Sequence, residues 1–204
     1  MRRLIRSIKQ PTGGLELNKD PATVDWCKRR IGMKKSICLL LVLFVAGCAF
    51  PATKEGMVVT NYVAPKQTGE RIFIKESTGG STTLPFWTSQ ISNDNFTEAV
   101  KESLLNSKAF SALSTNWGDE WGLEIDIRKV NQPFIGTEFT VTTDITYTLY
   151  LKGKKVHEAS IHEAGTATFS DSIWGVKRLR LANEFSGRAN VKKFIAELSS
   201  QRLD

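Results

Sequence analysis

Apolar and polar side chains alternate along much of the second half of the chain. Apolar residues hold every second position over residues 123–127 and, except for Thr143, again over residues 139–149, with threonines and charged residues between them. Such alternation predicts strands with one buried face and one wet face. A turn at residues 152–154 and a returning strand at residues 156–169 follow. Together these stretches predict an antiparallel meander.

Two earlier runs, residues 57–63 and 71–75, are short, apolar and bounded by glycine, proline and threonine, which predicts further strands. Two other segments have helical spacing. The first can be capped by Asn93 or Asp94 and ends near Phe110. The apolar stripes are Phe96, Val100, Leu104 and Leu105 in the first helix, and Leu181, Phe185, Ala189, Ile195 and Leu198 in the second.

Strands and helices segregated in this way predict an α+β fold. We expect a two-layer sandwich: an antiparallel sheet, built as a meander, with both helices packed on one face. A single domain, residues 57–204, would hold these elements, and residues 48–56 would form a tether in front of it. A chain of this size buries about two-thirds of its unfolded surface, so it needs neither disulfides nor a metal to fold.

Residues 33–47 have the three parts of a secretory signal. Lys34 and Lys35 follow Met33 and supply the positive start, and residues 37–46 form an uncharged apolar run. A helix needs roughly 20 apolar residues to cross a bilayer. The run is too short to span and suits a signal peptide.

The end of this signal, Val45-Ala46-Gly47-Cys48, resembles the lipobox of bacterial lipoproteins. The resemblance implies cleavage between Gly47 and Cys48, a diacylglyceryl group on the Cys48 sulfur, and a further acyl chain such as palmitate on the freed amine. Two or more chains anchor a protein stably in a membrane. Ala49, rather than aspartate, follows the cysteine, which in this family implies the outer membrane, facing the periplasm, with the inner membrane as the alternative.

The order of predicted elements between residues 57 and 200 also resembles a loose group of small Gram-negative outer-membrane lipoproteins, of the YajG-like and LPS-assembly-lipoprotein-like types. This resemblance rests on element order and on the lipobox, and it includes no catalytic motif. It implies an assembly or auxiliary role in the cell envelope.

Residues 1–32 precede an already complete signal. They are rich in lysine and arginine and are interrupted by prolines and glycines. We favour the interpretation that translation starts at Met33 and that the upstream stretch is mis-assigned coding sequence. The alternative is a genuine extended start to the signal. Under either interpretation the stretch is not part of the folded domain.

The net charge of +7 resides in the leader. Residues 1–47 hold ten of the 28 lysines and arginines and three of the 21 aspartates and glutamates, so the remainder holds 18 of each and is neutral. A neutral domain has no overall attraction to phosphate backbones, and we expect no nucleic-acid partner. Of the three cysteines, only Cys48 follows the signal, which leaves no disulfide, thiol nucleophile or cysteine metal site in the domain.

The sequence indicates no catalytic or metal centre and no cofactor. His157 and His162 are five positions apart, whereas the zinc-protease signature needs histidines four apart on a helix. On a strand these two side chains would point to opposite faces. No Gly-x-Ser-x-Gly elbow is present. We therefore expect a protein that is not an enzyme.

The candidate partner surface comprises Trp174, Lys177, Arg178 and Arg180, expected between the last strand and the last helix. Arginine and lysine pair with phosphate, and tryptophan favours membrane interfaces, so this cluster suits an anionic glycolipid. The alternative is an ordinary start to a helix with Trp174 packed on the sheet. Three other aromatic sites, Phe86-Trp87, Trp117 and Trp121, are expected in the core or at its rim.

The leading functional hypothesis is a non-enzymatic, lipid-anchored periplasmic protein that binds an envelope protein or glycolipid as an assembly or transport-auxiliary component. It would offer a sheet edge or the Trp174 segment to its partner. A second hypothesis is a carrier or sensor of lipid or lipopolysaccharide, which predicts an apolar cavity between sheet and helices. A third, a hydrolase, requires His157 or His162 to lie within hydrogen-bond reach of a carboxylate and a hydroxyl.

Overall fold

The computed structural model describes residues 50–83, 89–118, 120–133 and 135–200. Contacts divide the chain into residues 1–46 and residues 47–204, and all described residues belong to the second unit. The expected signal and the whole lipobox lie outside the described residues: Val45, Ala46, Gly47 and Cys48. The aromatic pair Phe86-Trp87 lies outside them as well.

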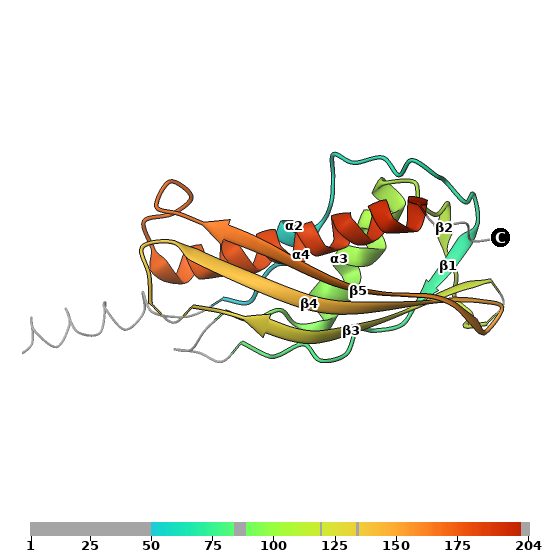
Figure 1. Cartoon of the computed structure of the whole chain (residues 1–204), viewed down its shortest axis with the longest axis horizontal. Helices are drawn as coiled ribbons and strands as arrows, with labels where there is room; N and C mark the ends of the chain where they lie inside the picture. The colour runs from blue at the N-terminus through green and yellow to red at the C-terminus, as the bar shows by residue number, and fades with distance from the viewer. Residues whose placement is uncertain (1–49, 84–88, 119, 134, 201–204) are drawn as a thin grey trace, which may run out of the picture. The chain divides into compact units, whose positions relative to one another are not determined.

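The described chain folds around a mixed sheet of five strands in the order β2-β1-β3-β4-β5 (Figure 1). The strands are β1 (Arg71–Ile74), β2 (Ala112–Leu113), β3 (Trp121–Asn131), β4 (Phe139–Leu151) and β5 (Lys154–Ala167). β3, β4 and β5 are long and antiparallel. This part of the prediction is confirmed, because alternation specifies which face of each strand is buried and the short β4–β5 turn sets their pairing.

The sheet as a whole is not purely antiparallel, which corrects the predicted fold. β1 pairs in parallel with both β2 and β3. The helix α3 (Asn93–Asn106) lies in sequence between β1 and β2, and such a crossover returns the chain to the end of the sheet where it started, so that both strands run the same way. β1 and β2 are too short for their pattern of apolar and polar residues to indicate parallel pairing.

The helix α4 (Gly175–Ser200) runs along β4 and β5, and the short helix α2 (Lys54–Met57) contacts both α3 and α4 (Figure 1). Buried apolar residues of α3 and α4, such as Phe96 and Phe194, belong to the same hydrophobic core as Leu123 and Ile145 of the sheet. The opposite face of β4 carries threonines, Asp144 and Tyr150, which are exposed or partly exposed. The fold class is α+β, as predicted.

Several predicted boundaries are wrong. Residues 57–63 form no strand: Met57 ends α2, and the Val59 amide donates to the Ser103 hydroxyl instead of joining the sheet. The cap of α3 is Ser92, whose hydroxyl accepts from the amide of residue 95. The helix α3 ends at Asn106, before the expected Phe110, and α4 begins at Gly175, six positions before Leu181, the first residue of the predicted stripe.

The buried face of α4 also differs from the predicted stripe. Apart from Leu179, the first half of the helix buries mainly small and polar residues, among them Ala182, Asn183, Ser186, Gly187 and Asn190, whereas Leu181, Phe185 and Ala189 are partly exposed. The cause is a close approach of helix and strand. A Cβ on Gly165 of β5 would lie 2.1 Å from the Ser186 amide nitrogen. Large apolar side chains do not fit between backbones that are this near.

The packed domain begins before the expected end of the tether at residue 56. Ala52 is fully buried, and its amide donates to the Gln90 carbonyl. The Thr53 amide and hydroxyl both donate to Glu184 of α4, at 2.9 and 2.8 Å. Glu184 is 3% exposed, so this carboxylate ties the start of the domain to the middle of α4.

Candidate functional site

The candidate partner surface lies where β5 ends and α4 begins. Asp171 shapes the turn that joins them: its carboxylate accepts from the Thr168 amide at 2.7 Å and from the Thr168 hydroxyl at 3.0 Å. These hydrogen bonds hold the pKa of Asp171 below its ordinary value. A charged carboxylate that accepts several donors fixes the backbone path of such a turn.

Arg178 hydrogen-bonds to the turn from its buried side. Its side chain is buried, and one nitrogen donates to the carbonyls of Ser172 and Ile173 at 3.0 and 3.1 Å. The guanidinium also lies 3.9 Å from the centre of the Phe169 ring and 5.4 Å from that of Phe139. A guanidinium tolerates burial here because two carbonyls and two ring faces stabilise its charge.

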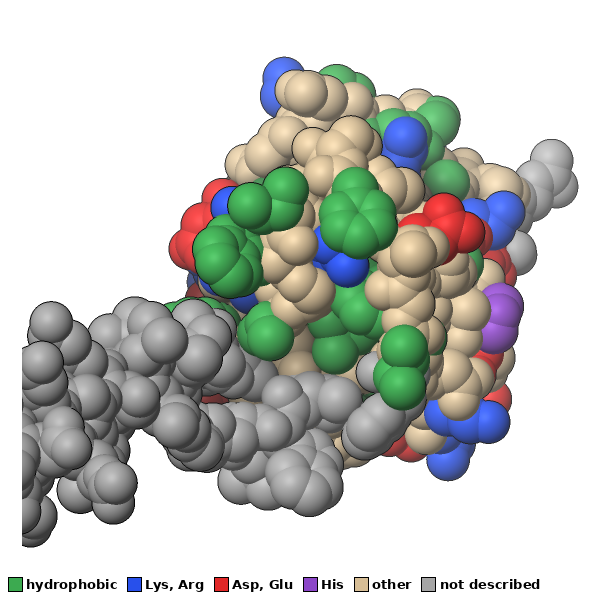
Figure 2. Space-filling model, turned by 90° about the vertical axis from the view of Figure 1, so that its left-hand side faces the viewer, with side chains coloured by type: hydrophobic (Ala, Val, Ile, Leu, Met, Phe, Trp, Pro, Cys, Tyr) green, Lys and Arg blue, Asp and Glu red, His purple; other side chains and the backbone are tan. Residues whose placement is uncertain are grey.

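The result is a rigid turn that presents large apolar side chains to solvent. Phe169, Ile173 and Trp174 are 55%, 74% and 62% exposed, and we call these three residues the apolar tip. Figure 2 looks onto this end of the domain and shows hydrophobic side chains gathered around it. Ile135, which follows β3 at the same end of the sheet, is 89% exposed. Exposed apolar side chains gathered in this way form a candidate contact surface.

Charges of both signs flank the apolar tip: the Asp171 carboxylate lies within the turn, and the start of α4 is basic. Lys177 is exposed, and Arg180 lies 3.5 Å from the Glu184 carboxylate. Together with Arg178, they place three cations in the first two turns of α4, which has no acidic residue in its first turn. The amino-terminal end of a helix already carries partial positive charge, so this arrangement opposes helix stability. Local conflicts of this kind are expected at functional positions.

The three cations of the candidate partner surface are placed differently from the prediction. Arg178 is not at the surface: it is buried and positions the turn. The cations lie within α4 itself and not in a loop before it. Trp174 is exposed, so the alternative in which it packs on the sheet is wrong. Trp121 is buried, and Trp117 packs at the rim against Phe73 and Tyr150.

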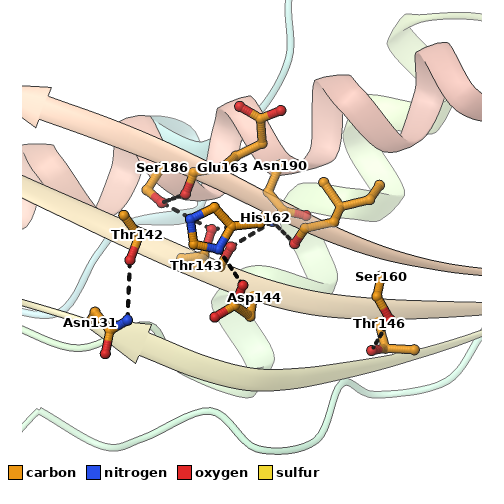
Figure 3. Close-up of polar contacts among 11 residues, drawn as sticks. Asn131, Thr142, Thr143, Asp144, Thr146, Ser160, His162, Glu163, Ser186 and Asn190 are labelled. Carbon is orange, nitrogen blue, oxygen red and sulfur yellow. Dashed lines mark hydrogen bonds and ion pairs between the residues drawn. The ribbon is translucent and has the colours of Figure 1, made fainter.

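Between α4 and the sheet lies a buried polar cluster of Thr143, Tyr147, Ser186 and Asn190. Figure 3 shows Thr143, Ser186 and Asn190 of this cluster. The Asn190 side chain accepts from the Tyr147 hydroxyl at 2.9 Å and donates to the Ile161 carbonyl at 2.9 Å. The Ser186 hydroxyl contacts that of Thr143 at 2.9 Å. The recurrence of residues 182, 186 and 190 at helical spacing was the available sequence signal, but small and polar residues do not resemble a core stripe.

This cluster bears on the carrier hypothesis. Tyr147 stacks on Phe194 at 4.0 Å between ring centres, and both are fully buried. Burial holds the pKa of Tyr147 well above its ordinary value. Packed rings and paired polar groups fill this part of the helix–sheet layer, which is where the carrier hypothesis places an apolar cavity.

The outer edge of β5 is partly covered by α4. Ser186 donates to the Glu163 carbonyl at 3.0 Å, and Asn190 donates to that of Ile161. Gly165 lies against the helix backbone. Over this stretch, backbone carbonyls that could accept hydrogen bonds from an added strand already accept them from side chains of α4. The edge of β5 is therefore a weaker docking place for another strand.

The histidines are separated, as the strand alternation predicted. His157 faces α4, where it lies 3.6 Å from Glu197, and His162 pairs with Asp144 on the open face (Figure 3). Among the described residues, no group of three His, Cys, Asp or Glu side chains is placed to hold a metal ion.

The open face of the sheet has one hollow of about 310 Å³ near its middle, lined mostly by polar and charged side chains of β3, β4 and β5. Glu124 is its most engaged group: Lys75 donates to one oxygen and the Tyr150 hydroxyl to the other, at 2.7 Å. These donors lower the pKa of Glu124. Its carboxylate is therefore held as a paired anion and is not poised for proton transfer.

Across the part of the chain that the structure describes, no helix has both the length and the hydropathy needed to cross a membrane.

The sequence matches no protein-family model, and no curated protein matches it. Protein XCC0632 from Xanthomonas campestris, of the family DUF330, is similar with a TM-score of 0.53 and 12% identity, over 70% of this chain and 92% of its own. This likeness shows a shared fold alone. A minor lipoprotein from Acinetobacter baumannii has a TM-score of 0.44 and 12% identity, over 67% and 96% of the two chains. Uncharacterized lipoprotein B from Nitrosomonas europaea has 0.39 and 13%, over 68% and 87%. Scores this low bear on neither fold nor function.

Proposed function

We propose that this chain is a lipid-anchored protein of the Gram-negative cell envelope, attached through Cys48, that works without catalysis as a binding or assembly component. In this proposal it resides on the periplasmic face of the outer membrane and acts at the membrane surface. Its partner is another envelope component, met through the apolar tip and the basic start of α4.

The observation that carries the proposal is the short distance between the lipobox cysteine and the packed domain. Ala52 is already buried, and it is four positions after Cys48. Four extended residues span at most roughly 14 Å. A domain held this closely cannot reach across a wide space to a distant partner. It is suited to bind what lies at its own membrane.

A binding role is supported further by where the unusual side chains lie. Exposed apolar residues and cations meet at one end of the domain, whereas His157 and His162 lie on opposite faces of β5. His162 contacts Asp144, but a hydrolase would also need a hydroxyl within reach of the same site. The proposal therefore favours a contact surface over a catalytic centre.

Mass spectrometry of the protein extracted from membranes tests the anchoring. We expect a tryptic peptide that begins at an acylated Cys48 and ends at Lys54. The Cys48→Ser variant should instead retain residues of the signal. Cys38→Ser, which removes a thiol within the signal, is the matched control and should be processed normally. A peptide from Ser36 to Lys54 with an unmodified Cys48 in the unaltered protein would contradict the proposal.

A further inference from the structure

We infer that the apolar tip inserts into the interfacial layer of the bilayer that holds the anchor, so that the occupant of this surface is lipid. The inference deepens the proposed function and rests on it for the position of Cys48. It assigns a role to Phe169, Ile173 and Trp174 that lipid anchoring alone does not require.

The side chains of the apolar tip suit an interfacial layer. Tryptophan prefers the boundary between acyl chains and headgroups, where its ring is half apolar and half wet. Phe169 and Ile173 add apolar surface on either side of the turn. Lys177, exposed one turn further along α4, can extend its ammonium toward headgroup phosphates while its stem lies along apolar surface. Anionic headgroups would also offset the unfavourable positive charge at the start of the helix.

The chain path places the anchor and the apolar tip within reach of one membrane plane. Thr53 is tied to Glu184, which lies nine positions after the first residue of α4, about 14 Å along the helix axis. From Thr53 back to Cys48 the chain spans at most roughly 18 Å. The anchor can therefore lie level with the apolar tip. Phe50, two positions after Cys48, is itself 61% exposed.

Hydrogen bonds of Arg178 and Asp171 also hold the conformation of the turn. Arg178 holds the carbonyls of Ser172 and Ile173 from inside, and Asp171 holds Thr168. The apolar side chains therefore stay exposed at little further entropic cost, and a surface ordered in advance binds more tightly than one that must order on contact.

Fluorescence quenching tests the inference directly. The acylated full-length protein is placed in vesicles of phosphatidylethanolamine and phosphatidylglycerol that contain phosphatidylcholine brominated near the headgroup end of its acyl chains. We expect bromine to quench part of the tryptophan emission, and Trp174→Phe to abolish most of that quenching. Trp117→Phe, which changes a tryptophan at the other end of the sheet, should leave it unchanged.

A second measurement removes the anchor. In a Cys48→Ser background, Ile173→Asp should weaken partition onto vesicles of phosphatidylethanolamine and phosphatidylglycerol by about tenfold, because it replaces an apolar contact with a charge. Val63→Asp is the matched control: Val63 is 60% exposed, in the connection between α2 and β1. Because both positions are exposed, both variants should unfold at the same urea concentration as their parent.

The outcomes separate the two claims. An acylated Cys48 with no bromine quenching of Trp174 overturns the inference and leaves the anchoring intact. Quenching of Trp174 in a protein whose Cys48 carries no acyl group supports the inference and overturns the anchoring. Equal partition of the Ile173→Asp and Val63→Asp variants counts against the apolar tip.

Discussion

Replacing Asn190 should lower the stability of the domain, because its side chain makes several buried hydrogen bonds. Its amide donates to the Ile161 carbonyl and to the Thr143 backbone and hydroxyl oxygens, and its oxygen accepts from the Tyr147 hydroxyl. All of these contacts are buried. Asn190→Ala would leave at least the Tyr147 hydroxyl and the Ile161 carbonyl without these partners.

The magnitude follows from the cost of unpaired buried groups, about 1–3 kcal/mol each. Two such groups predict a loss of about 2–6 kcal/mol, against a total stability of about 5–15 kcal/mol for a domain of ordinary size. Urea unfolding of residues 48–204 with Cys48→Ser, followed by circular dichroism, measures it. The exposed Thr140 hydroxyl, 2.8 Å from that of Thr166, provides a control: Thr140→Val should change stability by less than about 0.5 kcal/mol. A loss below about 1 kcal/mol for Asn190→Ala, at an unchanged slope with urea, would refute the reasoning.

Two further predictions use the same unfolding assay. Gly165→Ala should destabilise the domain by several kcal/mol, because the added Cβ would lie 2.1 Å from the backbone of α4. Gly175→Ala is the control and should be neutral, because the added Cβ would have no neighbour closer than 3.8 Å. Equal effects of the two variants would contradict the close approach of β5 and α4. Glu124 has a lowered pKa because Lys75 and Tyr150 donate to it, so its stabilisation exists above its ordinary pKa and is lost as the pH falls through the lowered one. Since this pair is largely exposed, Glu124→Gln should cost at most about 1 kcal/mol at neutral pH. The difference from the unaltered protein should vanish in acid, below the lowered pKa; a difference that persists there would point to packing instead.

The sequence by itself determined the strands β3, β4 and β5 and their pairing. Alternation is a local property of a strand. Its two-residue period places every second side chain on the buried face, whichever helix packs on that face. The separation of His157 and His162 follows from the same rule and is seen in their partners, Glu197 and Asp144. The α+β class followed as well, because strand and helix periods occupy separate stretches of the chain.

Only the tertiary structure decided which face of α4 is buried and where the domain begins. Both depend on residues far apart in sequence. Gly165 admits the backbone of α4 so closely that small and polar residues replace an apolar stripe. Glu184 accepts from Thr53, 131 positions earlier, so a stretch that reads as a tether becomes part of the fold. Hydrogen bonds between such distant partners leave no periodic trace in the chain.

The candidate surface shows the same division. An aromatic residue next to several cations was visible as a cluster in the sequence, but composition cannot say which members face water. The structure buries Arg178 beneath the turn and leaves Trp174 exposed. The reason is that a guanidinium finds carbonyls of its own turn and ring faces nearby, whereas the side chains of Ile173 and Trp174 have no core left to enter. Side-chain burial is decided by the space that the rest of the fold leaves, and that is a property of the tertiary structure alone.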